Sequence, residues 1–256
     1  MSTTTTPSTE TQQKKGPLLS SGARQKLLAF ASLLGLLIFF SMASPSFMQI
    51  ENIVGILQAT AVNGVLAIAC TFVIITSGID LAVGTLMTFC AVMAGVIMVY
   101  WGWSFYIGVL GALLFGALIG MVNGTLIAKM KIPPFIATLG MMMLLKGLSL
   151  VISGTKPIYF SDVPEFTSIS QDSLIGYFLP SLPIPNAVLI LFLVAILGSF
   201  ILNKTILGTY TFALGSNEEA VRLSGVNVDR WKIIVYSFAG SLCGIAGLMI
   251  ASRLNS

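Results

Sequence analysis

The residues whose types and spacing carry the most chemistry lie in a polar stretch, residues 208–232, between two apolar runs. Glu218 and Arg222 stand at the i, i+4 spacing at which opposite charges pair on one face of a helix. Ser216 and Glu219 form a capping-box pattern, in which a hydroxyl and a carboxylate each satisfy an unpaired amide where a helix starts. The pattern therefore predicts a helix start that is stabilised by side-chain hydrogen bonds and one ion pair.

Gly225 is the predicted stop of this helix, because glycine readily takes the left-handed conformation found at helix ends. The helix between the two signals has about two turns and is too short to be stable alone. Ala220, Val221 and Leu223 give it small apolar contacts. Two interpretations stay open: a helix that docks against a partner on the membrane face, and an ordinary solvated loop.

The composition indicates a membrane protein and excludes several classes of enzyme. The chain is 56% hydrophobic and 9% charged, whereas a soluble domain carries about 25% charged residues. It contains no histidine, which removes HExxH metal sites and nucleophiles activated by histidine. Its three cysteines lie in apolar runs without a CxxC pair, so we expect no disulfide framework, no metal site and no cofactor.

Neither ATP hydrolysis nor nucleic-acid binding fits the sequence. The phosphate-cradling pattern GxxxxGK[ST] does not occur, so we expect no enzyme activity in this chain and a partner that supplies energy. The net charge is only +4 and the basic residues are spread along the edges of apolar runs, which disfavours nucleic acid as a partner.

The elements that must position these residues are membrane helices. Apolar runs close to the ~20 residues that cross a bilayer core predict an all-α, polytopic transmembrane bundle. Seven spans are predicted, at residues 27–43, 53–75, 81–99, 104–128, 135–152, 187–202 and 233–252. The first run ends in small residues, as a signal peptide does, but its polar leader is long and six spans follow, which favours an uncleaved anchor.

The amino-terminal residues 1–23 are rich in Thr, Ser, Gln and Pro and predict a disordered cytoplasmic tail, followed by a transmembrane domain over residues 24–256. With the amino terminus inside, only Lys156 and Arg253 lie outside, and Lys146 lies within the membrane. The polar loop 204–232 is then cytoplasmic and the Pro-rich loop 153–185 external. The basic residues on the cytoplasmic side are Lys14, Lys15, Arg24, Lys26, Lys129, Lys131, Lys204, Arg222, Arg230 and Lys232.

Small residues recur at four-residue spacing in two of the spans. They are Gly116, Gly120 and Gly124 in one, and Gly240 and Gly244 in the last. Such spacing lets helix backbones approach closely, so we expect these glycines to serve helix packing.

Two charged residues fall at or near membrane depth. Asp80 lies in TSGIDLAVGT, where polar residues interrupt two apolar runs; it either faces a cavity, a partner or the interface, or caps a short cytoplasmic turn. Lys146 lies about 11 residues beyond Phe135, roughly 16 Å along a helix. It needs an internal partner, an outward path to the interface, or water.

Three segments carry a family resemblance: TSGIDLAVGTLM, IPPFIATLGMMMLLKGLSLVISG and ALGSNEEAVRLSGVNVDRWKIIVYSFAGSLCGIAGL. They resemble the permease subunit of bacterial ABC importers for simple sugars, most closely the ribose type. The resemblance covers about residues 41–256, in which Ala82 stands where serine is expected and Val221 where alanine is expected. Members of the family continue for several more spans, so the chain resembles a partial permease with an incomplete transmembrane domain.

The resemblance implies a multi-pass protein of the bacterial inner membrane that forms the path of a ribose-like monosaccharide. Its implied partners are an ATP-hydrolysing subunit, a periplasmic sugar-binding protein, a second permease chain in a homodimer, and membrane lipid. Loop 204–232 becomes the cytoplasmic coupling loop. The implied ATPase-coupling residues are Gly215, Ser216, Asn217, Glu218, Glu219, Ala220, Arg222, Leu223, Ser224 and Gly225.

The alternative is an ion-coupled secondary transporter of a small polar solute. Broken helices and isolated intramembrane charges are typical of such proteins, although the sequence has no clear internal repeat. Under either interpretation, Asp80 and Lys146 are the expected residues of the translocation path.

Overall fold

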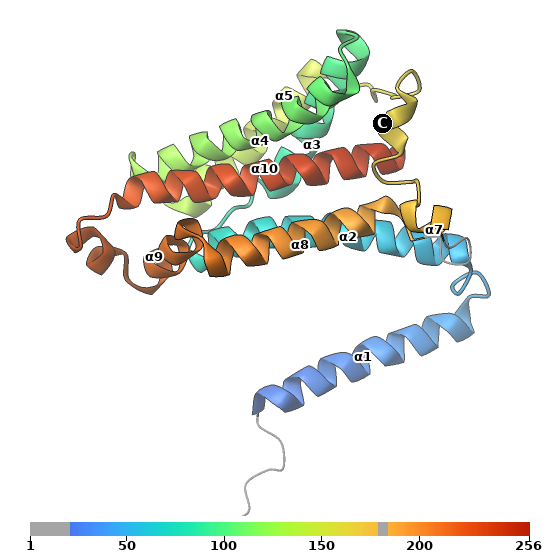
Figure 1. Ribbon diagram of the computed structural model, residues 1–256, viewed down its shortest axis with the longest axis horizontal. Coiled ribbons are helices and arrows are strands. Elements are labelled where there is room, and N and C mark those ends of the chain that lie inside the picture. The colour runs from blue at the N-terminus through green and yellow to red at the C-terminus, as the bar shows by residue number, and fades with distance from the viewer. Residues whose placement is uncertain (1–20, 179–183) are drawn as a thin grey trace, which may run out of the picture. The chain divides into compact units, whose positions relative to one another are not determined.

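The computed structural model describes residues 21–178 and 184–256, and every regular element in these ranges is a helix (Figure 1). The chain divides into two units, residues 1–53 and 54–256. The first unit contains α1 (Ser21–Ala43), which begins inside the predicted tail; residues 1–20 lie outside the described residues. Phe40 stacks on Phe47 within this unit, with ring centroids 5.6 Å apart.

The second unit is a helical bundle. It contains most of α2 (Ile50–Ile75), α3 (Val83–Gly95) with its π-helical extension η1 (Val96–Tyr100), α4 (Phe105–Ala128), α5 (Pro134–Ile152), α6 (Pro164–Thr167), α7 (Leu174–Phe178), α8 (Asn186–Lys204), α9 (Ile206–Leu223) and α10 (Val228–Leu254).

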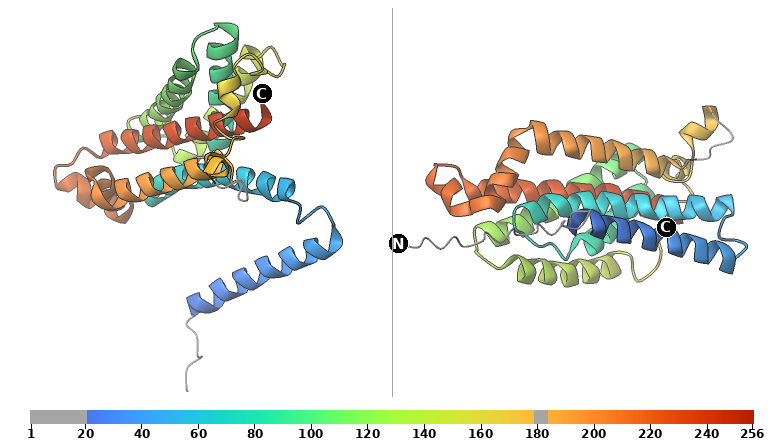
Figure 2. Two further views of the ribbon diagram at one scale, coloured as in Figure 1. Left: turned by 45° about the vertical axis from the view of Figure 1, so that its right-hand side comes forward. Right: turned by 90° about the horizontal axis from the view of Figure 1, so that it is seen from below.

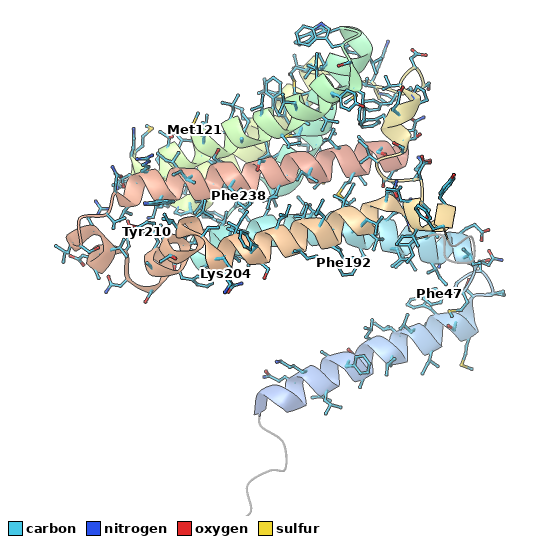
Figure 3. The ribbon with its side chains drawn as sticks, viewed as in Figure 1. Phe47, Met121, Phe192, Lys204, Tyr210 and Phe238 are labelled. Carbon is cyan, nitrogen blue, oxygen red and sulfur yellow. The ribbon has the colours of Figure 1, made fainter. Side chains whose placement is uncertain are left out.

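Seven of the described helices are long and apolar enough to cross a membrane, which confirms the predicted number and placement of spans. Their apolar side chains point outward as well as inward; Phe192, for example, projects from α8 away from the bundle (Figure 3). The last helix begins at Val228 rather than at residue 233, because its first turn is charged and does not register as an apolar run.

The α4–α10 seam is the tightest contact of the bundle (Figure 1). Gly116 and Gly240 face each other so closely that a Cβ on either would collide with the other's carbonyl. Gly120 lies against the carbonyl of Tyr236 in the same way. Ser237 also donates a hydrogen bond across the seam, 2.9 Å from its Oγ to the carbonyl of Ala117. The predicted role of these glycines in helix packing is confirmed.

α10 lies inside the second unit, with α3 and α4 beside it (Figure 2). Its buried side chains include Tyr236 and Met249, which are 2% and 0% exposed. Phe238 on the same helix packs edge-on against Phe72 of α2, with ring centroids 4.8 Å apart. α10 thus links the two groups of helices on either side of it.

The predicted external loop 153–185 folds over the end of α10 instead of extending away from it; its residues 179–183 lie outside the described residues. Phe160 stacks on Phe166 with centroids 3.8 Å apart, and both rings are buried. The amide of Ser170 donates to Oγ of Ser252 at 3.0 Å. Ser170 itself is 0% exposed, so a cysteine there cannot report on the accessibility of the loop, whereas Ser161 is exposed.

Candidate functional site

The predicted short helix is present, but its cap is not the predicted one. α9 breaks at Asn217, whose φ of −160° and ψ of 97° are not helical, so residues 218–223 form a separate short helix. The amide of Ala220 donates to Oδ1 of Asn217 at 2.9 Å. Asn217 is therefore the N-cap, and the predicted capping box of Ser216 with Glu219 is wrong.

Close contact between two backbones sets the position of this break. Gly215 lies against the carbonyl of Ile75 at the end of α2, where a Cβ would collide with that carbonyl. Oγ of Ser77 donates to the carbonyl of Gly215 at 3.4 Å. These contacts bind the first part of α9 to the end of α2 through residue 215, and the chain turns away soon after it.

The end of the short helix confirms the predicted stop. Gly225 has a φ of +85°, which is costly for a residue with a Cβ. Its amide donates to the carbonyl of Arg222 at 3.1 Å, and the amide of Ser224 donates to that of Ala220 at 3.1 Å. The last carbonyls of the helix are satisfied in this way.

Ion pairs fasten the short helix to neighbouring elements. Arg222 pairs with Glu218 at 3.2 Å, which confirms the predicted i, i+4 pair. Lys232 of α10 donates to the same carboxylate at 2.6 Å. Asp229 of α10 pairs with Lys131, between α4 and α5, at 3.0 Å and lies 3.8 Å from Arg222. We call these five residues the ion-pair network; it joins the short helix to α10 and to the α4–α5 connection.

The sequence singled out only two members of this network. Lys131, Asp229 and Lys232 stand far from Glu218 in the sequence or on a different helix, and pairing rules along one helix do not reach them. The usable signal was the concentration of charge beside apolar runs, which places opposite charges at the same membrane surface.

The network changes the titration of Glu218. Partial burial acts to raise the pKa of this carboxyl, but the hydrogen bond and charge of Lys232, and then those of Arg222, oppose it. The pKa of Glu218 is therefore lowered from its ordinary value, and the carboxylate form is favoured while it is paired.

The opposite face of the short helix is open. Leu223 is 84% exposed, and Glu219 and Ala220 are exposed beside it. Val221 is half-buried. An exposed apolar side chain on a capped, fastened helix provides a surface that another protein can contact.

The connection between α2 and α3 places Asp80 at a helix start. Ser77 takes a positive φ of 59° after α2, and residues 78–82 then connect to α3 without regular structure. Oδ1 of Asp80 accepts from the amide of Ala82 at 2.8 Å, just before the first turn of α3. Asp80 thus holds the turn that precedes α3, whose N-cap is Ala82; that this turn is cytoplasmic stays a prediction.

This connection runs into the bundle and is not a turn at the surface. Near its middle, the hydroxyl of Tyr236 donates to the carbonyl of Ile79 at 3.3 Å. Farther on, the carbonyl of Met87 in α3 lies against Gly247. Tyr236 and Gly247 are about 11 residues apart, so the chain advances roughly 16 Å along α10 between Ile79 and Met87. α3 therefore begins within the membrane-spanning part of the bundle.

Lys146 lies on α5 and lines a groove of about 390 Å³ between α3 and α5. Thr85 and Thr88 of α3 and Ser149 of α5 line the same groove. No carboxylate of the described residues lies within ion-pair distance of Lys146. Asp80 does not line this groove, so the structure does not bring the two predicted path residues together.

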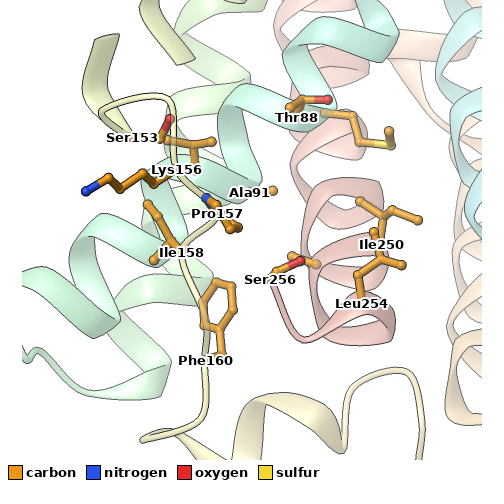
Figure 4. A pocket seen from close by; sticks show the side chains of 13 residues that line it. Thr88, Ala91, Ser153, Lys156, Pro157, Ile158, Phe160, Ile250, Leu254 and Ser256 are labelled. Atoms are coloured by element: carbon orange, nitrogen blue, oxygen red, sulfur yellow. The ribbon is translucent and has the colours of Figure 1, made fainter. Parts of the chain in front are cut away.

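A second cavity, of about 250 Å³, lies between residues 153–160, the last turns of α10 and residues 87–92 of α3 (Figure 4). Ile158, Phe160, Ile250 and Leu254 give it a mainly apolar lining. The amino group of Lys156 points away from these side chains (Figure 4). The arrangement is that of a loop packed on a helix end.

Comparison with known proteins decides between the functions that this geometry allows. Residues 52–256 match the family described as the permease component of the branched-chain amino acid transport system. The chain belongs to this permease family. It is a multi-pass protein of the inner membrane, and no solved structure matches it.

The curated relatives are import permeases for sugars. The ribose import permease protein of Escherichia coli K12 is 41% identical over 229 residues, which cover 88% of this chain and 68% of that protein. The ribose import permease protein of Bacillus subtilis is 38% identical over 249 residues, or 96% of this chain and 74% of that protein. The fructose import permease protein of Rhizobium meliloti is 37% identical over 206 residues, or 78% and 56%. These relatives favour the importer over the secondary transporter.

Proposed function

We propose that this permease is the membrane subunit of an ATP-driven importer for a ribose-like monosaccharide. The relatives at 38–41% identity are named for ribose, and a more distant one is named for fructose. The family's printed description refers to branched-chain amino acids. We follow the individual relatives, because they are similar over most of the chain and share a class of substrate.

The observation that carries the proposal is the short helix 218–223. It is capped by Asn217, ended at Gly225 and fastened by ion pairs, yet Leu223 and Ala220 are left exposed. A separate ATP-hydrolysing subunit is the proposed partner for this face. The proposed coupling residues are Gly215, Ser216, Asn217, Glu218, Glu219, Ala220, Arg222, Leu223, Ser224 and Gly225, within a coupling loop that spans residues 204–232.

The remaining partners follow from the same proposal. A periplasmic sugar-binding protein delivers substrate to the face formed by loop 153–185, and a second permease chain completes the path. Asp80 and Lys146 are the proposed path residues. Asp80→Asn removes the charge but keeps an acceptor for the amide of Ala82. A loss of uptake in this variant would therefore reflect the lost charge and not the loss of this hydrogen bond.

Reconstitution tests the proposal as a whole. The permease is co-expressed with candidate ATPases, purified with the one that it retains, and placed in liposomes with the binding protein. We expect uptake of labelled ribose that requires ATP and is unaffected when ion gradients are dissipated. Uptake by this chain alone that follows an ion gradient would contradict the proposal.

The proposed orientation has its own test. A cysteine at Ser161 is expected to react with a membrane-impermeant thiol reagent added outside intact cells, and one at Glu219 only after the cells are opened. Both positions are exposed, so a difference in labelling reports the side of the membrane and not burial.

A further inference from the structure

The groove between α3 and α5 contains a lysine at a depth where ionisable side chains are rare in membrane proteins. Lys146 lies about 12 residues beyond the start of α5, roughly 18 Å along the helix. Ser149 follows it at i, i+3 spacing and therefore lines the same face. Thr85 and Thr88 repeat that spacing on α3, so two polar stripes border one groove.

Ser149 is the second sign that the groove receives a polar ligand. Its side chain is buried, with 7% of the residue exposed, and its Oγ has no hydrogen-bond partner in the described part of the chain. Buried hydroxyls normally find a partner. Less than 1 Å² of this oxygen is accessible, but turning the side chain breaks no hydrogen bond of the described chain, so the hydroxyl can rotate to bond a molecule that enters the groove.

The donors and acceptors of the groove complement a polyol. Lys146 offers only donors, whereas Ser149 offers a donor and acceptors. Thr85 donates its proton to the carbonyl of Ala82 at 3.0 Å, and Thr88 donates to Gly84 at 3.1 Å. Their oxygens are left as acceptors, so a sugar hydroxyl can donate to one stripe and accept from the other.

A second copy of the chain is a poor occupant for this groove. Asp80 is the only acidic residue between Glu51 and Asp162, and its Oδ1 already accepts from its own helix start. A facing copy would bring another Lys146 and no free carboxylate from its spans. The ammonium group of Lys146 therefore needs water or a polar solute beside it.

We propose that Thr85, Thr88, Lys146 and Ser149 form a hydroxyl-binding wall of the translocation path, which the sugar contacts in the middle of the membrane. This inference rests on the proposed function. The groove, about 390 Å³, lies within the ~300–1,000 Å³ range of small-molecule sites. Met142, Met143 and Leu150 complete the lining, and none of the described aromatic side chains joins it, so the wall guides a passing sugar without holding it tightly.

The main test restores the charge chemically. Lys146→Cys is reconstituted with the ATPase and the loaded binding protein, and sugar uptake is measured before and after treatment with aminoethyl methanethiosulfonate. We expect the substitution to lower uptake by about tenfold, the loss typical of one charge-assisted hydrogen bond. The reagent restores an ammonium group and is expected to recover most of that loss, whereas methyl methanethiosulfonate recovers none.

Matched variants separate the groove from general damage. Thr88→Val is compared with Thr71→Val, because each threonine is exposed on its helix and bonds its own i−4 carbonyl, but only Thr88 lines the groove. We expect about a threefold loss of uptake for Thr88→Val, which is smaller than the loss expected when a full hydrogen bond is removed. We expect no loss for Thr71→Val. Stimulation of ATP hydrolysis by the binding protein is expected to persist in both.

The outcomes keep the two proposals apart. If the parent transports sugar but Lys146→Cys transports equally well, or recovers equally with the neutral reagent, the wall is refuted and Lys146 serves packing or reaches the lipid interface. If the parent shows neither uptake nor stimulated hydrolysis, the proposed function itself fails. The parent treated with each reagent controls for the native cysteines, of which Cys90 and Cys243 are buried.

Discussion

The α4–α10 seam and the short helix 218–223 both depend on small residues, for opposite reasons. In the seam, Gly116 and Gly120 are small because the backbone of α10 occupies the space that a side chain would need. In the short helix, Ala220 is small although it is exposed. The neighbouring backbone accounts for the small residues of the seam, whereas an exposed small residue leaves room for the proposed partner subunit. The following variants test this contrast.

The largest effect is expected in the seam. Gly120→Ala places a methyl group against the carbonyl of Tyr236, and we expect a loss of about 1–3 kcal/mol with a reduced yield of folded protein. Gly140→Ala in α5 is the matched control, because no heavy atom lies within 4 Å of its added Cβ. Thermal unfolding in detergent measures both; equal losses would show that the seam has no special demand for glycine.

In the short helix, bulk is expected to affect assembly and not stability. Ala220→Trp leaves the cap and the ion pairs in place, so the purified variant should unfold at the parental temperature. It should fail to retain the ATP-hydrolysing subunit on purification and lose stimulation by the loaded binding protein. Retention at the parental level would mean that this face is only solvated.

A smaller effect is expected at the end of the short helix. Gly225→Val forces a branched residue to a φ of +85°, a cost on the order of 1 kcal/mol or more. Among the described residues, no atom beyond the chain neighbours lies within 4 Å of a Cβ added here, so the cost is conformational and not steric contact with a neighbour. We expect faster proteolysis or amide exchange in residues 218–225, with partial loss of stimulated ATP hydrolysis. Asparagine tolerates this conformation better than valine does, so the effects of Gly225→Asn should lie between those of the parent and those of Gly225→Val.

Span number and placement could be predicted from the sequence, because hydropathy reports the transfer of each apolar run to lipid. The start of α10 could not, since its charged first turn is helical through pairing with other elements. The depth at which α3 begins could not be predicted either, because it too is set by contacts with other elements. The connection before α3 shows in the sequence only as a polar interruption between two apolar runs, and its place beside α10 is shown by the hydrogen bond from Tyr236 to Ile79.

At the candidate site, the sequence predicted the helix, its pair Glu218–Arg222 and its stop, all from rules within one turn. It chose the wrong cap because Ser216 and Asn217 are both good N-cap residues, one position apart. The choice is made by the contact of Gly215 with the end of α2, which is distant in sequence. The roles of Asp80 and Lys146 in the path stay predictions; the sequence could not show that Asp80 lies outside the groove of Lys146, since the two lie on elements whose relative position is set by packing.

The smallest effect is expected from the charge that fastens the short helix. The lowered pKa of Glu218 means that the folded state favours its carboxylate, so its contribution to stability is present above the pKa of the unfolded chain, about 4.3. That contribution is lost as the pH falls through the lower pKa of the folded state. Glu218→Gln should cost at most about 1 kcal/mol near neutral pH, because the pair is partly exposed. The difference from the parent should shrink below about pH 4 and at high salt.

The central claim is that the open face of the short helix receives the ATP-hydrolysing subunit, and crosslinking tests it most directly. A photoreactive residue replaces Leu223, which is 84% exposed, and in a second variant replaces Val151, which is 78% exposed near the other end of the spans. In the assembled transporter, the account predicts an adduct with the ATP-hydrolysing subunit from residue 223 and none from residue 151. The absence of that adduct from residue 223 in an assembly that hydrolyses ATP would contradict the account.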